Sequence, residues 1–464
     1  MLVICGAFLA LKLQQLLLYQ AIITPVVARG CCPGHAERGG CTVKNGEKLA
    51  ACPIVLFAGT LLLAKLLLVI VLFCPGRLMA SGFVVYNQDP KADGMATAAT
   101  ASIDNPSAIF YNPALLPDQP GFGVSLGDAI VMTERTYTDA ATGTRAHLKP
   151  GVNNVPSLFA KYTRDQWSVG IGVYNPFGLS NDWGRTWIGR YSATYSELNA
   201  IFVTPTVAYK FNDSVSAGFG FSYVTSSVDL QNMLPFTPYP DGRAKLTGSG
   251  DGVGVNAGVR IKLPQEYTLS FTGRSPVKIK YDGTANFYTP NDTLFKAVYP
   301  ALRDSDVSTT ITLPWQLTGG IAKQIGALTL EVDVVYIGWS TVDHYRVKFD
   351  DGRQSALYNK DWYDTFSFGA GANYRWSPSL ETQLGYMYDM GCVPQRTMTP
   401  DLPDASKHIL TAGIGYTAGP IKANLAYQAT FFQRASSVNN IVNAPSGRYN
   451  QFLQIILLSL SYSR

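Results

Sequence analysis

The sequence predicts an all-β protein, a fourteen-stranded antiparallel transmembrane β-barrel with an N-terminal hatch, or plug, inside its lumen. After residue 120 the chain consists of segments of alternating polarity, as expected when one face of each strand meets lipid and the other meets the lumen. Charged residues make up only 15% of the chain, against 47% hydrophobic and 12% aromatic residues. From residue 81 onward no uninterrupted apolar run approaches the ~20 residues that a membrane-spanning helix needs.

The alternation is clearest in the segments 328–336, 366–375, 380–389 and 421–431. Successive side chains of a strand point to opposite faces. In 366–375 one face carries Phe, Phe, Ala, Ala and Tyr, and the other carries Ser, Gly, Gly, Asn and Arg. A soluble sandwich also alternates, but here the apolar faces often end in Tyr or Trp, which is typical of an interfacial girdle. Unpaired backbone groups are costly in lipid, so the strands are expected to form a closed barrel.

Fourteen strands are expected, an even number as in single-chain bacterial barrels. Short links such as Asn212-Asp213 and Ser377-Pro378-Ser379 are expected to be periplasmic turns, and the long links extracellular loops. The expected strands are 121–134, 155–163, 167–174, 200–210, 214–231, 252–262, 267–285, 308–325, 327–347, 364–376, 380–389, 407–417, 421–433 and 451–462, and the expected loops are 175–199, 232–251, 286–307, 348–363, 390–406 and 434–450.

Residues 1–80 form a separate N-terminal extension with two apolar stretches, 1–27 and 53–73. The second stretch has a basic flank before it and is followed by a small residue at the cleavage position, so we interpret it as a signal peptide cleaved after Ala80. The alternative is that one or two membrane helices stay attached. Residues 1–45 have no barrel-like pattern and are compatible with an over-long start of the reading frame.

Charge and cysteine content also divide the chain at residue 80. The first 80 residues hold seven basic and two acidic residues, which accounts for the net charge of +5, and six of the seven cysteines. The remainder is neutral and holds only Cys392, so it contains no internal disulfide and gives no reason to expect nucleic-acid binding.

Residues 81–120 do not alternate and are expected to form the hatch, ahead of the barrel at 121–464. The small-residue stretch 94–101 is expected to be a short helix. It leads into Asn105-Pro106 and Asn112-Pro113-Ala114, which are the candidate hatch and gating residues. The segment is too polar and too often interrupted by proline to span a membrane. A periplasmic tail is the alternative to a plug.

A series of short motifs runs in order through nearly all of residues 81–464, and the most specific of them opens the hatch. The motifs are Ser81-Gly82-Phe83, Gly94-Met95-Ala96, 104–115, Pro176-Phe177-Gly178-Leu179, 187–191, 273–279, Leu313-Pro314, Gly338-Trp339-Ser340, Tyr388-Asp389 and Val393-Pro394. Together they resemble one family, the FadL-type outer-membrane transporters of long-chain fatty acids, some of whose members carry aromatic hydrocarbons such as toluene.

The resemblance implies uptake of hydrophobic molecules across a bacterial outer membrane. Ligand would be captured at the extracellular loops, held in an inner apolar pocket and released sideways into the membrane through a kinked third strand. The implied partners are a hydrophobic small molecule, the lipid bilayer with its lipopolysaccharide, and the outer-membrane assembly machinery, with the protein itself a monomer. Asn175-Pro176 is the candidate lateral opening, because proline donates no ladder hydrogen bond; an ordinary strand end is the alternative.

The resemblance also implies ligand-binding residues, for which we take Arg346, Phe177 and Trp187. Family members meet the fatty-acid carboxylate with two basic residues, and only Arg346 matches one of them. The region matching the other, 228–232, has no Lys or Arg, which leaves aromatic hydrocarbon uptake open. Arg346 is alternatively a solvated residue near a loop. The chain ends Tyr462-Ser463-Arg464, so Tyr462 would have to serve as the terminal aromatic residue that the assembly machinery recognises.

No enzyme, cofactor or metal site is predicted. The G-x-S-x-G motif at 123–127 lies in an alternating strand, whereas a nucleophile elbow needs a strand-to-helix turn. The glycine motif at 252–257 has no βαβ unit around it, and the four histidines are scattered. A general diffusion porin is a further alternative, but it would have no plug.

Overall fold

The computed structural model describes residues 82–438, 440–442 and 444–464. The signal peptide and N-terminal extension predicted for residues 1–80 lie outside the described residues. Among the described residues no helix is both long enough and apolar enough to cross a membrane.

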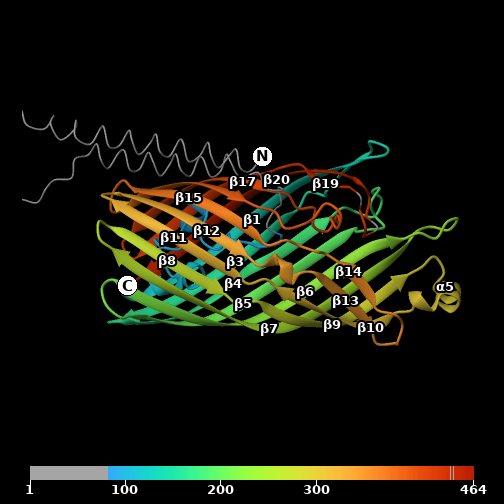
Figure 1. Ribbon diagram of the computed structural model, residues 1–464, viewed down its shortest axis with the longest axis horizontal. Coiled ribbons are helices and arrows are strands. Elements are labelled where there is room, and N and C mark those ends of the chain that lie inside the picture. The colour runs from blue at the N-terminus through green and yellow to red at the C-terminus, as the bar shows by residue number, and fades with distance from the viewer. Residues whose placement is uncertain (1–81, 439, 443) are drawn as a thin grey trace, which may run out of the picture. The chain divides into compact units, whose positions relative to one another are not determined.

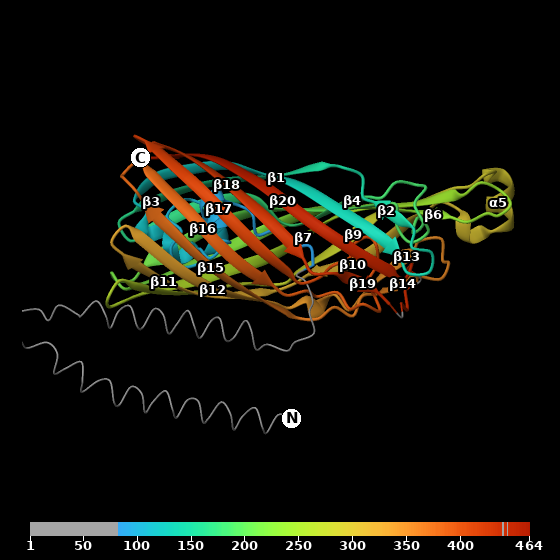
Figure 2. The same cartoon turned by 90° about the horizontal axis from the view of Figure 1, so that it is seen from above.

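Fourteen antiparallel strands form a closed barrel in the described part of the chain, which confirms the predicted fold class (Figures 1 and 2). β1 pairs with β3 on one side and with β20 on the other, so the first and last strands close the ring. Two barrel strands are each interrupted by a proline, at Pro276 between β8 and β9 and at Pro314 between β10 and β11. The barrel strands are β1 (Gly121–Asp139), β3 (Val152–Arg164), β4 (Trp167–Asp182), β5 (Tyr195–Lys210), β6 (Val215–Leu234), β7 (Gly242–Leu263), β8 (Tyr267–Arg274) with β9 (Val277–Tyr288), β10 (Ser305–Leu313) with β11 (Gln316–Ile325), β12 (Leu328–Ile337), β15 (Thr365–Arg375), β16 (Leu380–Asp389), β17 (Lys407–Ala418), β18 (Ile421–Phe432) and β20 (Gly447–Ser463).

The remaining elements are short and lie in the hatch or in the loops. The hatch contains α3 (Pro90–Gly94), α4 (Ala108–Tyr111) and η1 (Pro113–Asp118). The loops contain β2 (Arg145–His147), α5 (Asp292–Val298), η2 (Pro300–Leu302), η3 (Trp339–Thr341), β13 (His344–Phe349), β14 (Ala356–Asn359) and β19 (Ala435–Ser437).

The two ends of the barrel differ in the length of their connections. At one end the strands are joined by short turns, at 165–166, 211–214, 264–266, 326–327, 376–379 and 419–420. At the other end the connections are longer, at 140–151, 183–194, 235–241, 289–304, 338–364, 390–406 and 433–446. Outer-membrane barrels have short periplasmic turns and long extracellular loops, so the second end is the extracellular one.

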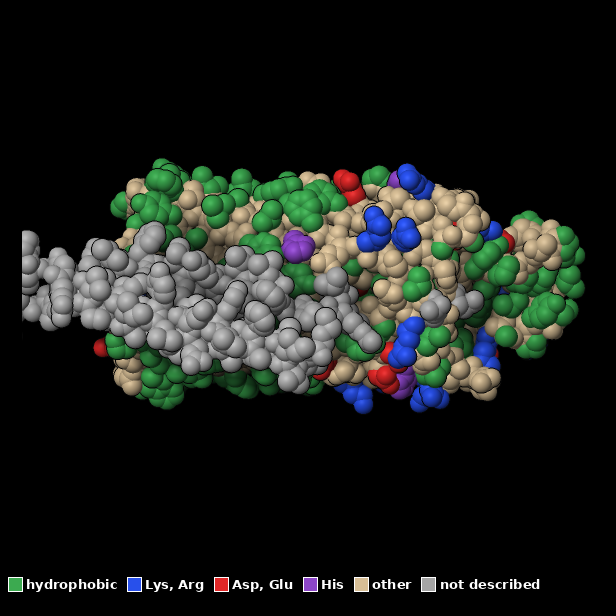
Figure 3. All heavy atoms as spheres, turned by 45° about the horizontal axis from the view of Figure 1, so that its top comes forward, with side chains coloured by type: hydrophobic (Ala, Val, Ile, Leu, Met, Phe, Trp, Pro, Cys, Tyr) green, Lys and Arg blue, Asp and Glu red, His purple; other side chains and the backbone are tan. Residues whose placement is uncertain are grey.

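Large apolar side chains are exposed on the outer face of the strands, which is the arrangement that lipid requires. In Figure 3 hydrophobic side chains cover the barrel toward the turn end, and Lys and Arg side chains gather toward the loop end. The exposed apolar residues include Leu126, Phe219, Phe221, Val253, Phe271, Leu317, Leu384, Leu410, Ile414 and Leu458.

Several expected strand limits were wrong. The expected strand 327–347 is β12, which ends at Ile337 and is followed by η3 and the separate strand β13. The expected loop 232–251 is largely strand, because β7 begins at Gly242 and pairs with both β6 and β9 above the membrane belt. The third barrel strand does not end at Tyr174; β4 continues to Asp182 through Asn175-Pro176. Its pairing with β5 shifts in register between Tyr174 and Phe177 and then resumes, because a bulge accommodates the proline.

Residues 82–118 lie inside the barrel and are almost entirely buried. The helix expected at 94–101 was wrong, since α3 covers only Pro90–Gly94, begins at a side-chain cap from Asp89 and is followed by positive φ angles at Ala96 and Thr97. The small residues that follow α3 allow the hatch to pack closely against the barrel wall. A Cβ at Gly371 or Gly385 of the wall would lie within 2.5 Å of backbone atoms of Met95 or Ala96.

Charged side chains hold the hatch to the barrel wall. Lys91 forms ion pairs with Asp104 at 2.8 Å and with Glu381 of β16 at 3.2 Å. The carboxylate of Asp333 on β12 accepts the backbone N–H groups of Ala99 and Thr100, each at 3.1 Å. Buried charges of this kind persist only when they are paired and hydrogen-bonded, so the hatch and the barrel stabilise one another.

The seating of the hatch depends on wall glycines, and this gives a first prediction. A Cβ at Gly218 would lie 2.5 Å from the carbonyl carbon of Pro113. We expect Gly218→Val to assemble as a barrel with a displaced hatch and therefore to conduct ions more readily than the wild type in planar bilayers. Gly151→Val is the matched control, because a Cβ there meets open space. Equal conductance of the Gly218 variant and the control would contradict the account.

Candidate functional site

The barrel wall is incomplete between β3 and β4. The two strands pair from Arg164↔Trp167 to Leu158↔Val173, and beyond this point β3 continues toward Val152 paired only with β1. A proline lies on each side of the gap, Pro156 on β3 and Pro176 on β4. Since proline has no N–H group, neither residue can donate a ladder bond across it. The edge of β4 is therefore free at this level of the barrel.

The beginning of the hatch occupies this free edge from the inside. Val84 forms an antiparallel bridge with Phe177. The N–H of Val85 donates to the carbonyl of Pro176 at 2.8 Å, and the N–H of Gly178 donates to the carbonyl of Phe83 at 3.0 Å. The hatch segment 83–85 thus takes the place of the missing strand partner.

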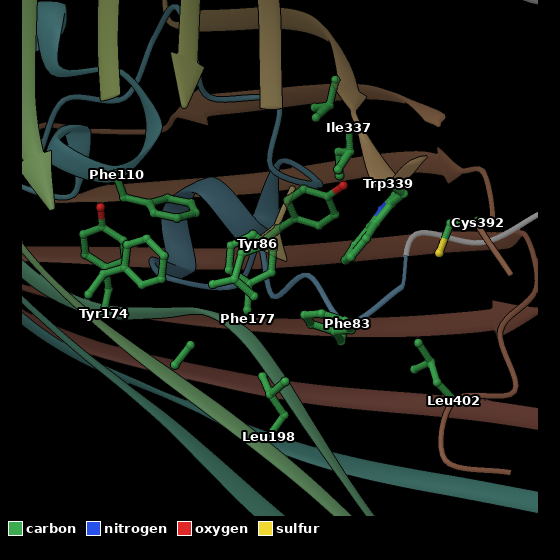
Figure 4. Packing of buried hydrophobic residues seen from close by; sticks show 14 of the residues in the cluster. Phe83, Tyr86, Phe110, Tyr174, Phe177, Leu198, Ile337, Trp339, Cys392 and Leu402 are labelled. Atoms are coloured by element: carbon green, nitrogen blue, oxygen red, sulfur yellow. The ribbon is translucent and has the colours of Figure 1, made fainter. Parts of the chain in front are cut away.

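A cavity of about 370 Å³ lies where the hatch, the β3–β4 gap and the loop 390–406 meet. Much of its wall is apolar. Aromatic rings pack beside it, with Phe83 and Phe177 at a centroid distance of 5.9 Å and Phe83 and Trp339 at 5.0 Å (Figure 4). The apolar lining residues include Phe83, Phe177, Leu179, Leu198, Leu402, Leu453 and Ile455.

Two cations also line the cavity, and they differ in their partners. Lys407 pairs with the buried carboxylate of Asp389 at 3.1 Å. Arg135 of β1 is half-buried; its Nε donates to Gln451 at 2.7 Å and its Nη1 donates to Asn181. No carboxylate in the described part of the chain forms an ion pair with Arg135. Its guanidinium is fixed by hydrogen bonds to neutral groups, and the carboxylates of Asp401 and Asp404 act on it from beyond ion-pair distance.

The nearest loop carboxylates have other partners. Asp401 pairs with Lys360 at 3.1 Å. Asp404 accepts the N–H of Gly82 at 2.8 Å, which ties the start of the described hatch to the loop 390–406. Burial raises the pKa of Asp404 to about 6, while the charge of Lys407 acts in the opposite direction.

The structure separates the predicted ligand-binding residues. Phe177 lines the cavity at the β3–β4 gap. Trp187 lies in the loop 183–194, where its ring stacks on Trp183 at 4.6 Å and its indole N–H donates to the carbonyl of Ala193 at 2.8 Å. Arg346 lies on β13 with an exposed side chain, and it does not line the cavity that contains Phe177.

The predicted gating residues are all buried within the hatch. Asn105 donates to Asp89 at 3.1 Å and accepts from Ser107, so it fixes the turn before α4. Asn112 caps η1 by accepting the N–H of Ala114 at 3.0 Å. Pro113 packs on Gly218 and Pro106 packs on Gly123 of the wall. The structure gives these residues the role of shaping the hatch.

Asn175 and Pro176 lie at the edge of the gap, where Asn175 donates to Asn199 at 2.7 Å and its carbonyl accepts from Gln88 at 2.9 Å. Arg135 is the site residue that the sequence reasoning missed. The expected first strand stopped at 134, although the inward alternation of Val131 and Thr133 continues to Arg135. Extending the pattern by one step would have placed this cation in the lumen.

Comparisons with known proteins agree with this architecture. Residues 71–452 match the model of the family described as outer membrane protein transport protein (OMPP1/FadL/TodX). The chain belongs to this family. Members of the FadL/TodX family transport hydrophobic molecules through the outer membrane, so the protein is an outer-membrane transport protein and not an enzyme.

Relatives of the FadL/TodX family resemble the chain at modest identity. A long-chain fatty acid transport protein of Escherichia coli O6:H1 is 23% identical over 395 residues, which cover 77% of this chain and 88% of the relative. A putative outer membrane protein of Neisseria meningitidis is 25% identical over 449 residues, covering 84% and 96%.

Solved structures of the same family share the fold. A Pseudomonas aeruginosa FadL homologue superposes with a TM-score of 0.74 at 20% identity, covering 82% of this chain and 100% of the homologue. The toluene transporter TodX of P. putida gives a TM-score of 0.62 at 18% identity, covering 84% and 99%.

The burial of the Asp404 carboxyl group predicts a pH dependence of stability. The pKa of Asp404 in the folded protein, about 6, lies above its ordinary value of 3.8. The group therefore contributes stability that is complete below pH 3.8 and is lost as the pH rises through about 6. The shift corresponds to about 3 kcal/mol at most. We expect the Tm of the wild type in detergent to fall between pH 4 and pH 7 by more than that of Asp404→Asn. Parallel pH profiles of the two proteins would contradict this assignment.

Proposed function

We propose that the protein takes up long-chain fatty acids, holds them in the cavity at the β3–β4 gap and releases them sideways into the outer membrane. The observation that carries the proposal is the composition of the cavity, an apolar wall combined with one guanidinium that has no carboxylate partner in the described chain. A fatty acid has the same two parts, an alkyl chain and a carboxylate.

Both parts of such a ligand contribute a favourable free energy of binding in this cavity. Burial of the alkyl chain contributes about 0.8 kcal/mol per CH₂ group. Arg135 presents its guanidinium from a fixed position, held by Asn181 and Gln451, and guanidinium groups bind carboxylates through paired charge-assisted hydrogen bonds. Preorganisation lowers the entropy cost of binding, because the Arg135 side chain is already ordered.

Capture at the extracellular loops is supported by apolar surface there. Leu294, Val298 and Tyr299 of the loop 289–304 are exposed, as is Tyr239 of the loop 235–241. In Figure 3 hydrophobic side chains gather on the tip that projects at the loop end. Exposed apolar surface of this kind typically marks a site of interaction.

Sideways release is supported by the position of the cavity. Its lining includes residues 152–155 of β3 and Asn175 and Phe177 of β4, which border the gap in the wall. The hatch segment 83–85 covers the gap through a few backbone hydrogen bonds. Displacing that segment would connect the cavity to the lipid phase without breaking any pairing between barrel strands.

Uptake of a neutral aromatic hydrocarbon is the second candidate. The absence of a cation in 228–232 and the rings of Phe83, Phe177 and Trp339 beside the cavity favour it. Arg135 favours the acid, because a neutral ligand leaves the guanidinium without an ion-pair partner. A variant that lacks this charge therefore separates the two candidates.

Arg135→Gln is expected to lower oleate uptake at limiting concentration roughly tenfold or more, since a hydrogen bond to a charged group contributes about 1.5–3 kcal/mol. Toluene uptake is expected to stay at the wild-type level. Uptake is measured with radiolabelled ligands in cells that lack the endogenous transporter. Arg164→Gln, whose side chain is 79% exposed at the periplasmic end of β3, is the control. Unchanged oleate uptake by the Arg135 variant would refute its role, and no uptake by the wild type would refute the proposed function.

A disulfide across the hatch and β4 tests sideways release. In Val84→Cys/Phe177→Cys the new cysteines replace two residues that face each other in the antiparallel bridge. We expect the oxidised protein to lose oleate uptake and a reductant to restore it, because the cross-link holds the hatch on the gap. Val84→Cys/Phe177→Ser controls for the lost aromatic ring. Full uptake by the cross-linked protein would show that release does not require this segment to move.

A further inference from the structure

A cluster of cations lies on the outer face of the barrel, on β9, β10 and β13. Lys278 and Lys280 of β9 are exposed, while Ile279 and Tyr281 between and after them are buried. Directly opposite residues of paired strands lie on the same face. Thr310 therefore shares the outer face with Lys280, and Ser308 shares it with Lys348.

β13 adds the remaining cations to this face. His344, Arg346 and Lys348 are exposed and alternate with Tyr345 and Val347, which turn inward. In the part of the chain that the structure describes, neither Arg346 nor Lys348 forms an ion pair. Lys280 pairs with Asp282 at 3.0 Å, and His344 lies 3.0 Å from Asp343. We call Lys280, Arg346 and Lys348 the outer cation cluster.

The cluster surrounds a hollow of about 240 Å³ in the wall. Beyond Val307 and Ser308, β10 has no partner strand on the β13 side within the described residues, so the wall has a second gap here. Because of this gap, side chains from both the outer and the inner face of the wall line the hollow. The hydroxyl groups of Ser308, Thr309 and Thr310 line it together with the cations. Thr309 Oγ1 is buried and has no hydrogen-bond partner in the described structure.

The position of the cluster along the barrel axis places it at the level of the lipid headgroups. Trp315, Tyr336 and Phe366 form a ring contact on the outer face, with centroid distances of 5.0 Å and 4.8 Å. Aromatic side chains of this kind lie at membrane–water interfaces. β10 runs from its extracellular start at Ser305 down to Leu313, just before Trp315, so the cluster lies on the extracellular side of this aromatic group.

We propose that the outer cation cluster binds the phosphate groups of a phosphorylated glycolipid of the outer leaflet. Basic pockets directly above a hydrophobic belt recognise anionic headgroups, and phosphate oxygens accept from several donors at once. The hollow offers guanidinium and ammonium donors beside free hydroxyl groups. The position of the hollow on the outer face, on the extracellular side of the aromatic group, favours a lipid over a soluble anion, because the acyl chains of the same molecule then cover the belt below.

This proposal gives Arg346 a place outside the barrel. The residue was expected in the ligand pocket, but its exposed side chain lines the outer hollow and not the cavity that contains Arg135. The lipid site is therefore independent of the proposed fatty-acid site.

The test measures binding of deep-rough lipopolysaccharide to the full-length purified protein in detergent. Lys280→Gln/Arg346→Gln/Lys348→Gln is expected to bind roughly tenfold or more weakly than the wild type, given the contribution of each cation near an anionic headgroup. Lys149→Gln/Arg185→Gln is the matched control, since its exposed cations lie in another part of the loop end beside the carboxylates of Asp182 and Asp229. Heat-dependent gel mobility verifies that every variant is folded.

Two further probes separate the lipid from its phosphate. Lipopolysaccharide whose phosphates have been removed is expected to bind the wild type as weakly as the intact lipid binds the triple variant. Inorganic phosphate is expected to compete only at much higher concentration than the lipid. The proposal is overturned if the triple variant retains wild-type affinity, if the dephosphorylated lipid binds equally well, or if inorganic phosphate competes at the same concentration.

Discussion

The structure depends on one constraint, that every backbone hydrogen-bonding group at membrane depth must find a partner. A closed antiparallel ring satisfies this constraint, and here the pairing of β1 with β20 completes it. The constraint also explains the hatch at the β3–β4 gap. Where Pro156 and Pro176 prevent ladder pairing, the backbone of residues 83–85 supplies the missing partner to β4. Two prolines in the sequence thus prevent strand pairing at this gap, and the backbone of the hatch restores it.

The fold class was predictable because its signal is spread over the whole chain. The period-two alternation recurs in every barrel strand, so single errors do not change the strand count. The strand limits were less predictable, since the added part of β7 at 242–251 is mostly polar and the added part of β4 begins with Asn175-Pro176. The break at Asn175-Pro176 was visible as a proline, but pairing across the bulge depends on β5, which no local pattern reveals.

The candidate site was only partly predictable for a related reason. Phe177 was found through its motif, whereas Arg135 belongs to no motif and becomes significant only when Asn181 and Gln451 are brought beside it. These residues come from β1, β4 and β20, and only the folded barrel brings their side chains within hydrogen-bond distance of one another. Arg346 is the opposite case. The resemblance predicted it in the ligand pocket, whereas in the structure it lies on the outer face of the wall.

The two gaps in the wall show how the same backbone defect acquires different chemistry. Both arise next to prolines, at Pro156 and Pro176 in one case and at Pro314 in the other, and both leave a strand edge without a partner strand. The first is covered by hatch backbone and bordered by apolar side chains, so an alkyl chain can replace the hatch there at little electrostatic cost. The second is surrounded by cations and free hydroxyl groups, which would repel an alkyl chain and attract phosphate. Side chains around a gap, rather than the gap itself, therefore determine whether it suits passage of a hydrophobic ligand or attachment to the surrounding lipid.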